Sequence, residues 1–142
     1  RGYGSIYVVN GSTVQTTSGT ANTYTQIAAF TTNSVAAGGV TPVAASDKLT
    51  LAAGVYSITF NASFTASNNH DFVFRCFNST AGTAFVNATG QNHTNSTNAH
   101  QVGFSAIISV ASTSDVIVQI ASPDTSQPFT ITAANFIALA IG

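Results

Sequence analysis

The 142-residue chain is poor in charge, since Asp, Glu, Lys and Arg make up only 5% of it, against about 25% in a typical soluble domain. It has three Lys or Arg residues and a formal net charge of −1. No basic stripe is available to neutralise phosphates, which argues against nucleic-acid binding. A free monomer with so few charges depends on hydroxyls and amides for solubility, so we expect neighbouring subunits or a protein shell to cover much of the surface.

Long apolar runs and paired cysteines are also missing. The longest apolar stretch, 136–141, is far shorter than the roughly 18 residues that span a membrane, so we expect no membrane insertion. Cys76 is the one cysteine, which excludes an intramolecular disulfide, and its period-two neighbours Phe72 and Phe74 predict a small buried side chain. The chain starts at Arg1 and contains no Met, so we expect this start to be a processed or engineered boundary.

Catalytic and metal-binding patterns are absent as well. The three histidines, His70, His93 and His100, do not have the His-x-x-x-His or Cys-x-x-Cys spacings of zinc sites, and no cofactor is predicted. One alternative stays open, in which three copies of His100 meet a metal on a symmetry axis. No Gly-x-Ser-x-Gly elbow occurs, and the four Asp residues fall at expected turns and strand starts. We therefore predict that the protein is not an enzyme.

Glycosylation triplets of the form Asn-x-Ser/Thr are frequent, but so are Asn, Ser and Thr throughout the chain. About half as many triplets would arise by chance in such a composition, and one lies mid-strand, so we expect no glycans. The triplets begin at Asn10, Asn61, Asn78, Asn87, Asn92 and Asn95.

The pattern that is present is that of extended strands. In 55–64 the residues Tyr56, Ile58, Phe60, Ala62 and Phe64 recur at period two and make one face apolar. Similar runs bounded by turn residues occur throughout, which predicts an all-β, two-sheet sandwich formed by one domain, 1–142. The segments 31–45 and 90–99 are predicted as loops. The expected strands are 5–9, 24–30, 48–51, 55–64, 71–77, 83–88, 101–111, 116–121, 129–132 and 135–141.

Two of these strands, 71–77 and 135–141, are apolar on both faces, although an outer sandwich strand exposed to water should alternate. The second face of such a strand requires either another subunit or a long loop folded over the sheet. We assign Ile137, Leu139 and Ile141 to the core, and we expect the opposite set to lie in a subunit contact. The predicted contact residues are Phe136, Ala138, Ala140, Val73, Arg75 and Phe77.

Several of these segments resemble the C1q/TNF-like family of jelly-roll domains. Gly54-Val55-Tyr56 looks like that family's turn into its central strand, and 136–141 looks like its closing strand. Between them, 106–110 and 115–120 resemble its paired strands, with Ser114 where a Gly is usual. The resemblance covers the chain from Leu49 onward. It implies a jelly roll of about ten strands that forms a homotrimer with a binding or a structural role.

Within that superfamily, a chain rich in Thr, Ala and Asn, poor in Lys and without cysteine pairs looks like a phage or viral protein. We expect a virion structural protein, either a capsid decoration or a fibre head, that is assembled in the host cytoplasm and attaches to capsid or tail proteins. One alternative is a fibre head that binds a cell-surface receptor or a glycan. Another is a secreted C1q-like domain. The expected ligand-contact residues are Tyr24, Asn68, Asn69, His93 and Asn98.

Overall fold

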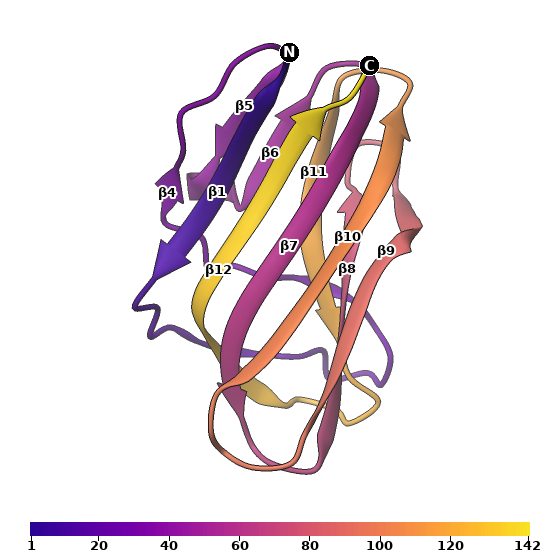
Figure 1. The fold of residues 1–142 in the computed structure, drawn as a ribbon. Coiled ribbons are helices and arrows are strands. Elements are labelled where there is room, and N and C mark those ends of the chain that lie inside the picture. Colours follow the sequence, from indigo (N-terminus) through magenta and orange to yellow (C-terminus); the bar gives the residue numbers. More distant parts are fainter.

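In the computed structural model, which describes residues 1–142, two antiparallel six-stranded sheets pack face to face (Figure 1). The front sheet, facing the viewer in Figure 1, has the order β10-β7-β12-β1-β4, with β2 paired to β12. The back sheet has the order β5-β6-β11-β8-β9, with β3 paired to β11. The chain crosses repeatedly between the sheets, as in a jelly roll. The prediction of an all-β two-sheet sandwich is confirmed.

The bounds of the elements follow, sheet by sheet. The front sheet contains β1 (Tyr3–Val9), β2 (Val14–Thr16), β4 (Thr32–Asn33), β7 (Gly54–Ala66), β10 (His100–Val110) and β12 (Pro128–Ala140). The back sheet contains β3 (Thr25–Gln26), β5 (Val40–Val43), β6 (Lys48–Leu51), β8 (His70–Asn78), β9 (Thr83–Thr94) and β11 (Ser114–Ala121). A single 3-10 turn, η1 (Ala44–Ser46), joins β5 to β6. No helix has the length and hydropathy needed to cross a membrane.

The core lies between the sheets and is built around β7. Its alternation is as predicted, with Tyr56, Ile58, Phe60, Ala62 and Phe64 all buried. These side chains belong to a cluster of 29 buried residues drawn from both sheets. Burial of this apolar surface is the main favourable term in folding.

The back sheet supplies the opposite wall of the core through β8, where Phe72, Phe74 and Cys76 are fully buried. Their aromatic rings pack on those of β7, with Phe60 and Phe74 centroids 5.7 Å apart. Burial raises the pKa of the Cys76 thiol to about 12, so at neutral pH it is a protonated, unreactive side chain. The predicted role of Cys76 as a small buried hydrophobe is confirmed.

Strand boundaries differ from the prediction in several places. The expected strands 129–132 and 135–141 form one strand, β12, because a register shift between Ile131 and Ala133 absorbs the irregularity. Of the expected strand 24–30, only Thr25 and Gln26 pair. The segment 31–45, predicted as a loop, contains β4, β5 and η1, and β2 was not predicted. Short edge strands pair through their backbone and need no apolar alternation, which explains why sequence pattern missed them.

The predicted loop 90–99 is also partly a strand, because β9 extends to Thr94. Its polar second half runs beside β10 and closes one side of the sandwich. The Asn92 side-chain amide donates to the Gln101 carbonyl at 2.9 Å. Gly90 and Gly103 meet backbone to backbone, and a Cβ on Gly90 would lie 2.1 Å from the Gly103 oxygen. Only glycine permits this approach.

The two ends of the sandwich differ. Both termini lie at one end, together with the β6–β7 and β10–β11 turns (Figure 1). The β7–β8, β9–β10 and β11–β12 turns lie at the other end, which we call the distal end (Figure 1).

Candidate functional site

The outer surface of β1, β12, β7 and β10, which we call the front face, is the most unusual surface of the molecule. Pairing register places Tyr3, Leu139, Ser57 and Ile107 in one row across it. These side chains point away from the core, because successive residues of a strand alternate between the two sides of a sheet. Leu139 is 48% exposed and Ile107 is 61% exposed.

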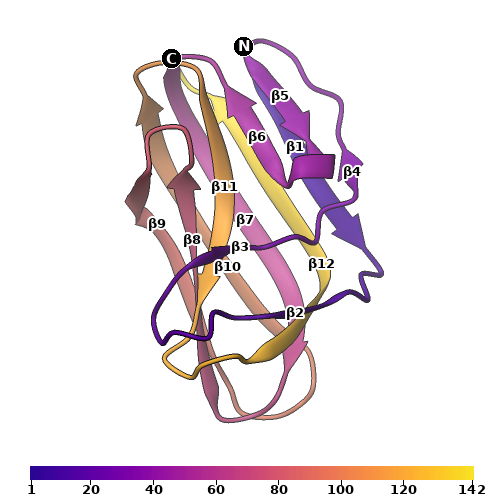
Figure 2. The ribbon, with the colours of Figure 1, turned by 180° about the vertical axis from the view of Figure 1, so that it is seen from behind.

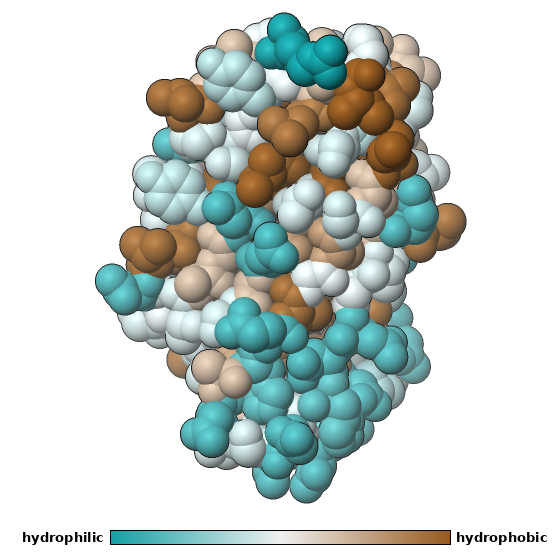
Figure 3. Space-filling view, in the orientation of Figure 1, coloured by the Kyte–Doolittle hydropathy of each residue, from teal (hydrophilic) through white to brown (hydrophobic).

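The half of the front face nearer the termini is apolar, and we call it the apolar half. Figure 3 shows apolar side chains gathered over this half and hydrophilic ones toward the distal end. Small side chains, Ser57, Thr59 and Ser105, lie between the larger ones, so another surface could approach closely. The apolar half consists of Tyr3, Val55, Ile107, Ile137, Leu139 and Ile141.

Toward the distal end the front face becomes polar without becoming charged. Asn135 pairs with Asn61, and both side chains are exposed. Beside them lies a shallow depression of about 290 Å³ that is also lined by Tyr7 and Gln101. The four long front strands contain none of the chain's Lys, Arg, Asp or Glu residues. The front face is therefore a sheet surface without formal charge, and depletion of charge is characteristic of buried protein interfaces.

Two of the predicted contact residues on β12 were assigned to the wrong face. Phe136 and Ala138 are fully buried, and the Phe136 ring packs 6.5 Å from that of Phe60. The physical reason is register, because Phe136 is paired with Phe60 and Ala138 with Ile58, whose side chains face the core. Ala140 is half-buried on the same side. The outward set is Ile137, Leu139 and Ile141, the residues that the sequence pattern assigns to the core.

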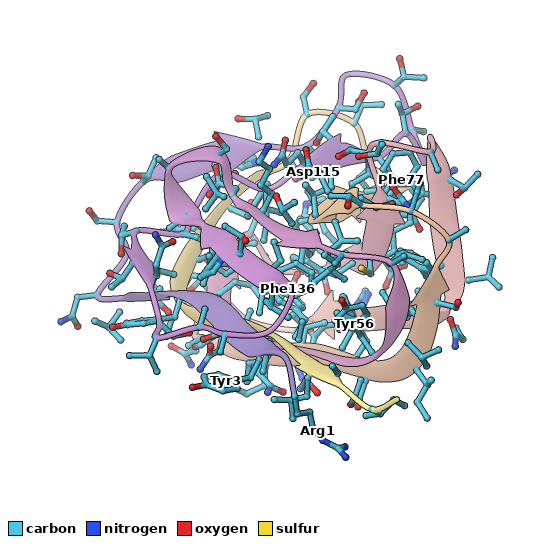
Figure 4. The ribbon with its side chains drawn as sticks, turned by 90° about the horizontal axis from the view of Figure 1, so that it is seen from above. Arg1, Tyr3, Tyr56, Phe77, Asp115 and Phe136 are labelled. Atoms are coloured by element: carbon cyan, nitrogen blue, oxygen red, sulfur yellow. The ribbon has the colours of Figure 1, made fainter.

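The other predicted contact residues, Val73, Arg75 and Phe77, lie on the outer surface of the back sheet. They are half-buried and belong to β8. Figure 4, seen along the sandwich, shows Phe77 and Tyr3 on opposite sides, with Phe136 between the sheets. The β8 residues and the apolar half therefore do not form one continuous surface. Part of the cover of β8 comes from the chain itself, because the Tyr24 ring lies 3.7 Å from the Arg75 guanidinium.

Four of the five predicted ligand-contact residues lie near the distal end. Asn68 and Asn69 form the exposed turn between β7 and β8, and Asn98 is exposed between β9 and β10. The His93 ring is 2.7 Å from the Asp71 carboxylate. Tyr24 lies apart from these residues. It directly precedes β3, which pairs with β11 in the back sheet (Figure 2), and its ring lies over the Arg75 guanidinium of β8.

The histidines do not converge on one site. His70 contacts Asp124 at 2.7 Å, His93 contacts Asp71, and His100 contacts Asn95 at 3.1 Å. The His100 ring packs 6.1 Å from that of Phe64, on the core side of β10, so it does not point out of the front face. No group of three or more His, Cys, Asp or Glu side chains is placed to hold a metal.

The carboxylate with the strongest partners is Asp115. It accepts hydrogen bonds from the Thr50 hydroxyl at 2.7 Å and from the Lys48 ammonium at 2.9 Å. These contacts, the Thr50 bond first, hold the pKa of Asp115 below its ordinary value. Asp115 therefore contributes stability that is present at neutral pH and is lost as the pH falls through the folded-state pKa.

We expect Asp115→Asn to lower the melting temperature at pH 7 by roughly 3 °C, the size expected for a partly exposed ion pair. The difference between the variant and the parent should shrink as the pH falls below the ordinary Asp pKa of 3.8 and disappear once the pH lies below the lowered folded-state pKa, where the carboxylate is protonated in both states. Thermal unfolding of both proteins across this pH range checks the prediction. A melting temperature that is lower than that of the parent by the same amount at every pH would contradict the prediction.

Asp47 provides a matched control, because its pKa is shifted in the opposite direction to that of Asp115. Burial raises the pKa of its carboxyl, so ionisation at neutral pH costs stability. Its Oδ1 accepts a hydrogen bond from the Phe30 amide at 3.0 Å, and its backbone has φ 54°, a conformation that Asn also adopts readily. Asp47→Asn should leave the melting temperature at pH 7 unchanged or slightly higher.

Sequence reasoning missed the front face, although a signal for it was present. The predicted strands 5–9, 55–64, 101–111 and 135–141 contain no charged residue, whereas Lys48, Asp71 and Arg75 fall in other predicted strands. The predicted strands 24–30, 83–88 and 116–121 also lack charge and lie in the back sheet, so charge alone would have drawn attention to the front strands without separating the two sheets.

Comparison with known proteins gives a match in structure alone. No family model and no curated protein matches the sequence. Among solved structures, the globular domain of the zebrafish complement 1qA protein is similar over 100% of this chain and 98% of its own, with a TM-score of 0.62 and 13% identity. The Eiger TNF of S. frugiperda is similar over 100% of this chain and 94% of its own, with a TM-score of 0.62 and 9% identity. Murine APRIL is similar over 96% of this chain and 99% of its own chain, with a TM-score of 0.54 and 12% identity. The chain therefore has the C1q/TNF-like jelly-roll fold that the resemblance implied.

Proposed function

We propose that the protein is a non-enzymatic homotrimeric head that assembles through the front face. The observation that carries this proposal is the uncharged front sheet, whose outer surface exposes the apolar half instead of alternating polar residues. Closed rings of identical subunits bury such a surface on every copy. The similarity of the fold to C1q and TNF-family structures supports the same arrangement.

In its biological setting, we propose that the trimer is part of a virion, as a capsid decoration or fibre head that attaches by surface complementarity. The near absence of charge supports this role, because a protein held in a shell needs less charge for solubility than a free one. The test is whether the purified protein binds empty capsid shells, and failure to bind any shell or tail would remove this part of the proposal.

The second candidate function is a head that binds a cell-surface receptor or glycan. It is favoured by the distal end, where exposed turns carry Asn68, Asn69 and Asn98 and the surface is hydrophilic (Figure 3). Exposed loops on a rigid scaffold commonly carry binding residues. Binding to cells or immobilised glycans, without binding to shells, would support this candidate.

The assembly itself is tested by mass in solution. Light scattering of the parent should give three times the 14.5 kDa of one chain, and Ile107→Asp should give a folded monomer. The reason is that the variant brings three carboxylates into a poorly solvated contact, where desolvation and repulsion cost several kcal/mol. Ile107 is 61% exposed in one chain, so the fold itself should tolerate the change.

The matched control is Thr20→Asp, which adds the same charge at an exposed position between β2 and β3. It should remain trimeric. A monomeric parent, or an Ile107→Asp variant that stays trimeric at neutral pH, would show that the front face is not the subunit contact.

A further inference from the structure

Arg75 is the one positively charged side chain within the sheets that has no acidic partner. Lys48 is paired with Asp115 at 2.9 Å. Asp71 and Asp124 are paired with His93 and His70. No carboxylate lies within 4.0 Å of the Arg75 guanidinium, although arginines that are partly removed from water usually have one.

The guanidinium is nevertheless held in a fixed position. The Tyr24 ring lies 3.7 Å from it and the Phe77 ring 5.2 Å from it. Its Nε donates to the Gln119 side-chain oxygen at 2.9 Å. This is the only hydrogen bond that Arg75 makes through its side chain, so its terminal N–H donors have no partner within the chain. The aromatic contacts and the Gln119 bond together orient a planar fork of free donors.

The surroundings of the fork limit the class of ligand. The residues paired with Arg75 and Gln119 across the sheet are Thr89 and Gln26, which carry a hydroxyl and an amide. A single cation among neutral hydrogen-bonding groups suits a ligand with one negative charge and many hydroxyls. A polyanion such as a nucleic acid or a sulfated polysaccharide would need several unpaired cations along the surface, whereas the other cation of the back sheet, Lys48, is paired with Asp115.

We propose that Arg75, Tyr24 and Gln119 form a binding site for the carboxylate of an acidic sugar, with the guanidinium contacting both carboxylate oxygens. The site rests on the second candidate function, glycan binding, and does not depend on trimer assembly. It lies on the back sheet, so a trimer formed through the front face would carry three copies facing outward. Three linked sites would bind a multivalent surface far more tightly than one site.

The competing explanation is that Arg75 only fastens the Tyr24 segment to the back sheet. Titration of the ¹⁵N-labelled protein with N-acetylneuraminic acid and with glucuronic acid separates the two. The Arg75 Nε–Hε resonance is the reporter, and the methyl ester of each acid is the matched neutral probe. We expect both acids, or one of them, to shift this resonance with saturation, and the esters to bind at least about tenfold more weakly, because they lack the charge that the fork recognises.

Variants make the test specific. Arg75→Lys keeps the charge and loses the planar fork, so it should weaken binding of the acid by roughly tenfold or more. Tyr24→Leu removes the ring that lies over the guanidinium and should also weaken binding of the acid, by a few-fold. Lys48→Gln removes a cation outside the site and should leave binding unchanged. If Arg75→Lys were unfolded in a thermal melt, Gln119→Leu would serve in its place, since it frees the Arg75 side chain and leaves the charge.

Several results would overturn the proposal. These are no shift of the Arg75 resonance with either acid, equal binding of acid and ester, an equal loss in Lys48→Gln, or tighter binding of inorganic phosphate than of either acid. The failure of trimer assembly is measured separately by light scattering and would leave the proposed site intact.

Discussion

Ala138→Asp is expected to prevent folding. Ala138 is fully buried between Ile58 and Gly4 in the register of the front sheet, within the hydrophobic core. An unpaired buried charge costs several kcal/mol, which is comparable with the whole stability of a domain, about 5–15 kcal/mol. The variant should lack the β-sheet spectrum and the cooperative thermal transition of the parent in circular dichroism.

The neighbouring residue provides the control. Leu139 is 48% exposed on the front face, so Leu139→Asp should keep the fold and its cooperative melt while losing assembly. One step along the same strand thus separates a folding defect from an assembly defect. A well-folded Ala138→Asp protein would show that the two faces of β12 have been assigned the wrong way round.

Phe60→Ala is expected to lower the free energy of unfolding by about 3–5 kcal/mol. Phe60 is fully buried, and its ring contacts those of Phe74, Phe104 and Phe136 at centroid distances of 5.7, 5.3 and 6.5 Å. These partners belong to both sheets, so the cavity left by the ring cannot be closed by the movement of one strand. Urea unfolding should show a lower midpoint with an unchanged slope.

The control for this measurement is Val86→Ala. Val86 is 89% exposed, so its truncation should change the free energy of unfolding by less than about 0.5 kcal/mol. Equal midpoints for Phe60→Ala and Val86→Ala would mean that Phe60 is not at the centre of the core.

The fold was predictable because the sequence pattern of one strand indicates it clearly. Strict alternation in 55–64 fixes which side of β7 faces the core, and Gly54-Val55-Tyr56 resembles the turn that opens the central strand of the family. The structure adds a local reason for this turn, because the Tyr56 hydroxyl donates to the Ala52 carbonyl at 2.7 Å and ties the start of the strand.

The face of β12 was not predictable from that strand alone. Phe136 with Ala138 and Ile137 with Leu139 are both apolar pairs, so hydrophobicity does not decide between them. The register with β7 decides, since it places Phe136 beside Phe60. The inward face could have been assigned correctly only from this register, which the strand patterns by themselves do not give.

The proposed Arg75 site could not be predicted from the sequence, for a different reason. Tyr24 and Arg75 are far apart in the sequence, and their contact depends on the path of the segment between β2 and β4, which has almost no regular structure. Sequence reasoning had named both residues, Tyr24 as a ligand contact and Arg75 as a subunit contact, without placing them together. Loop paths depend on many weak local choices, which periodicity does not report.

Both termini lie at one end of the sandwich, so an attachment through either terminus leaves the distal end pointing away from it (Figure 1). β7 runs from that end to the distal end over 13 residues, a distance of about 40 Å at the usual rise of a strand. Any protein fused to either terminus would therefore sit about 40 Å from the turns that carry Asn68, Asn69 and Asn98. The domain could be immobilised or displayed through either terminus while the distal turns and the outer surface of the back sheet stay open to a ligand.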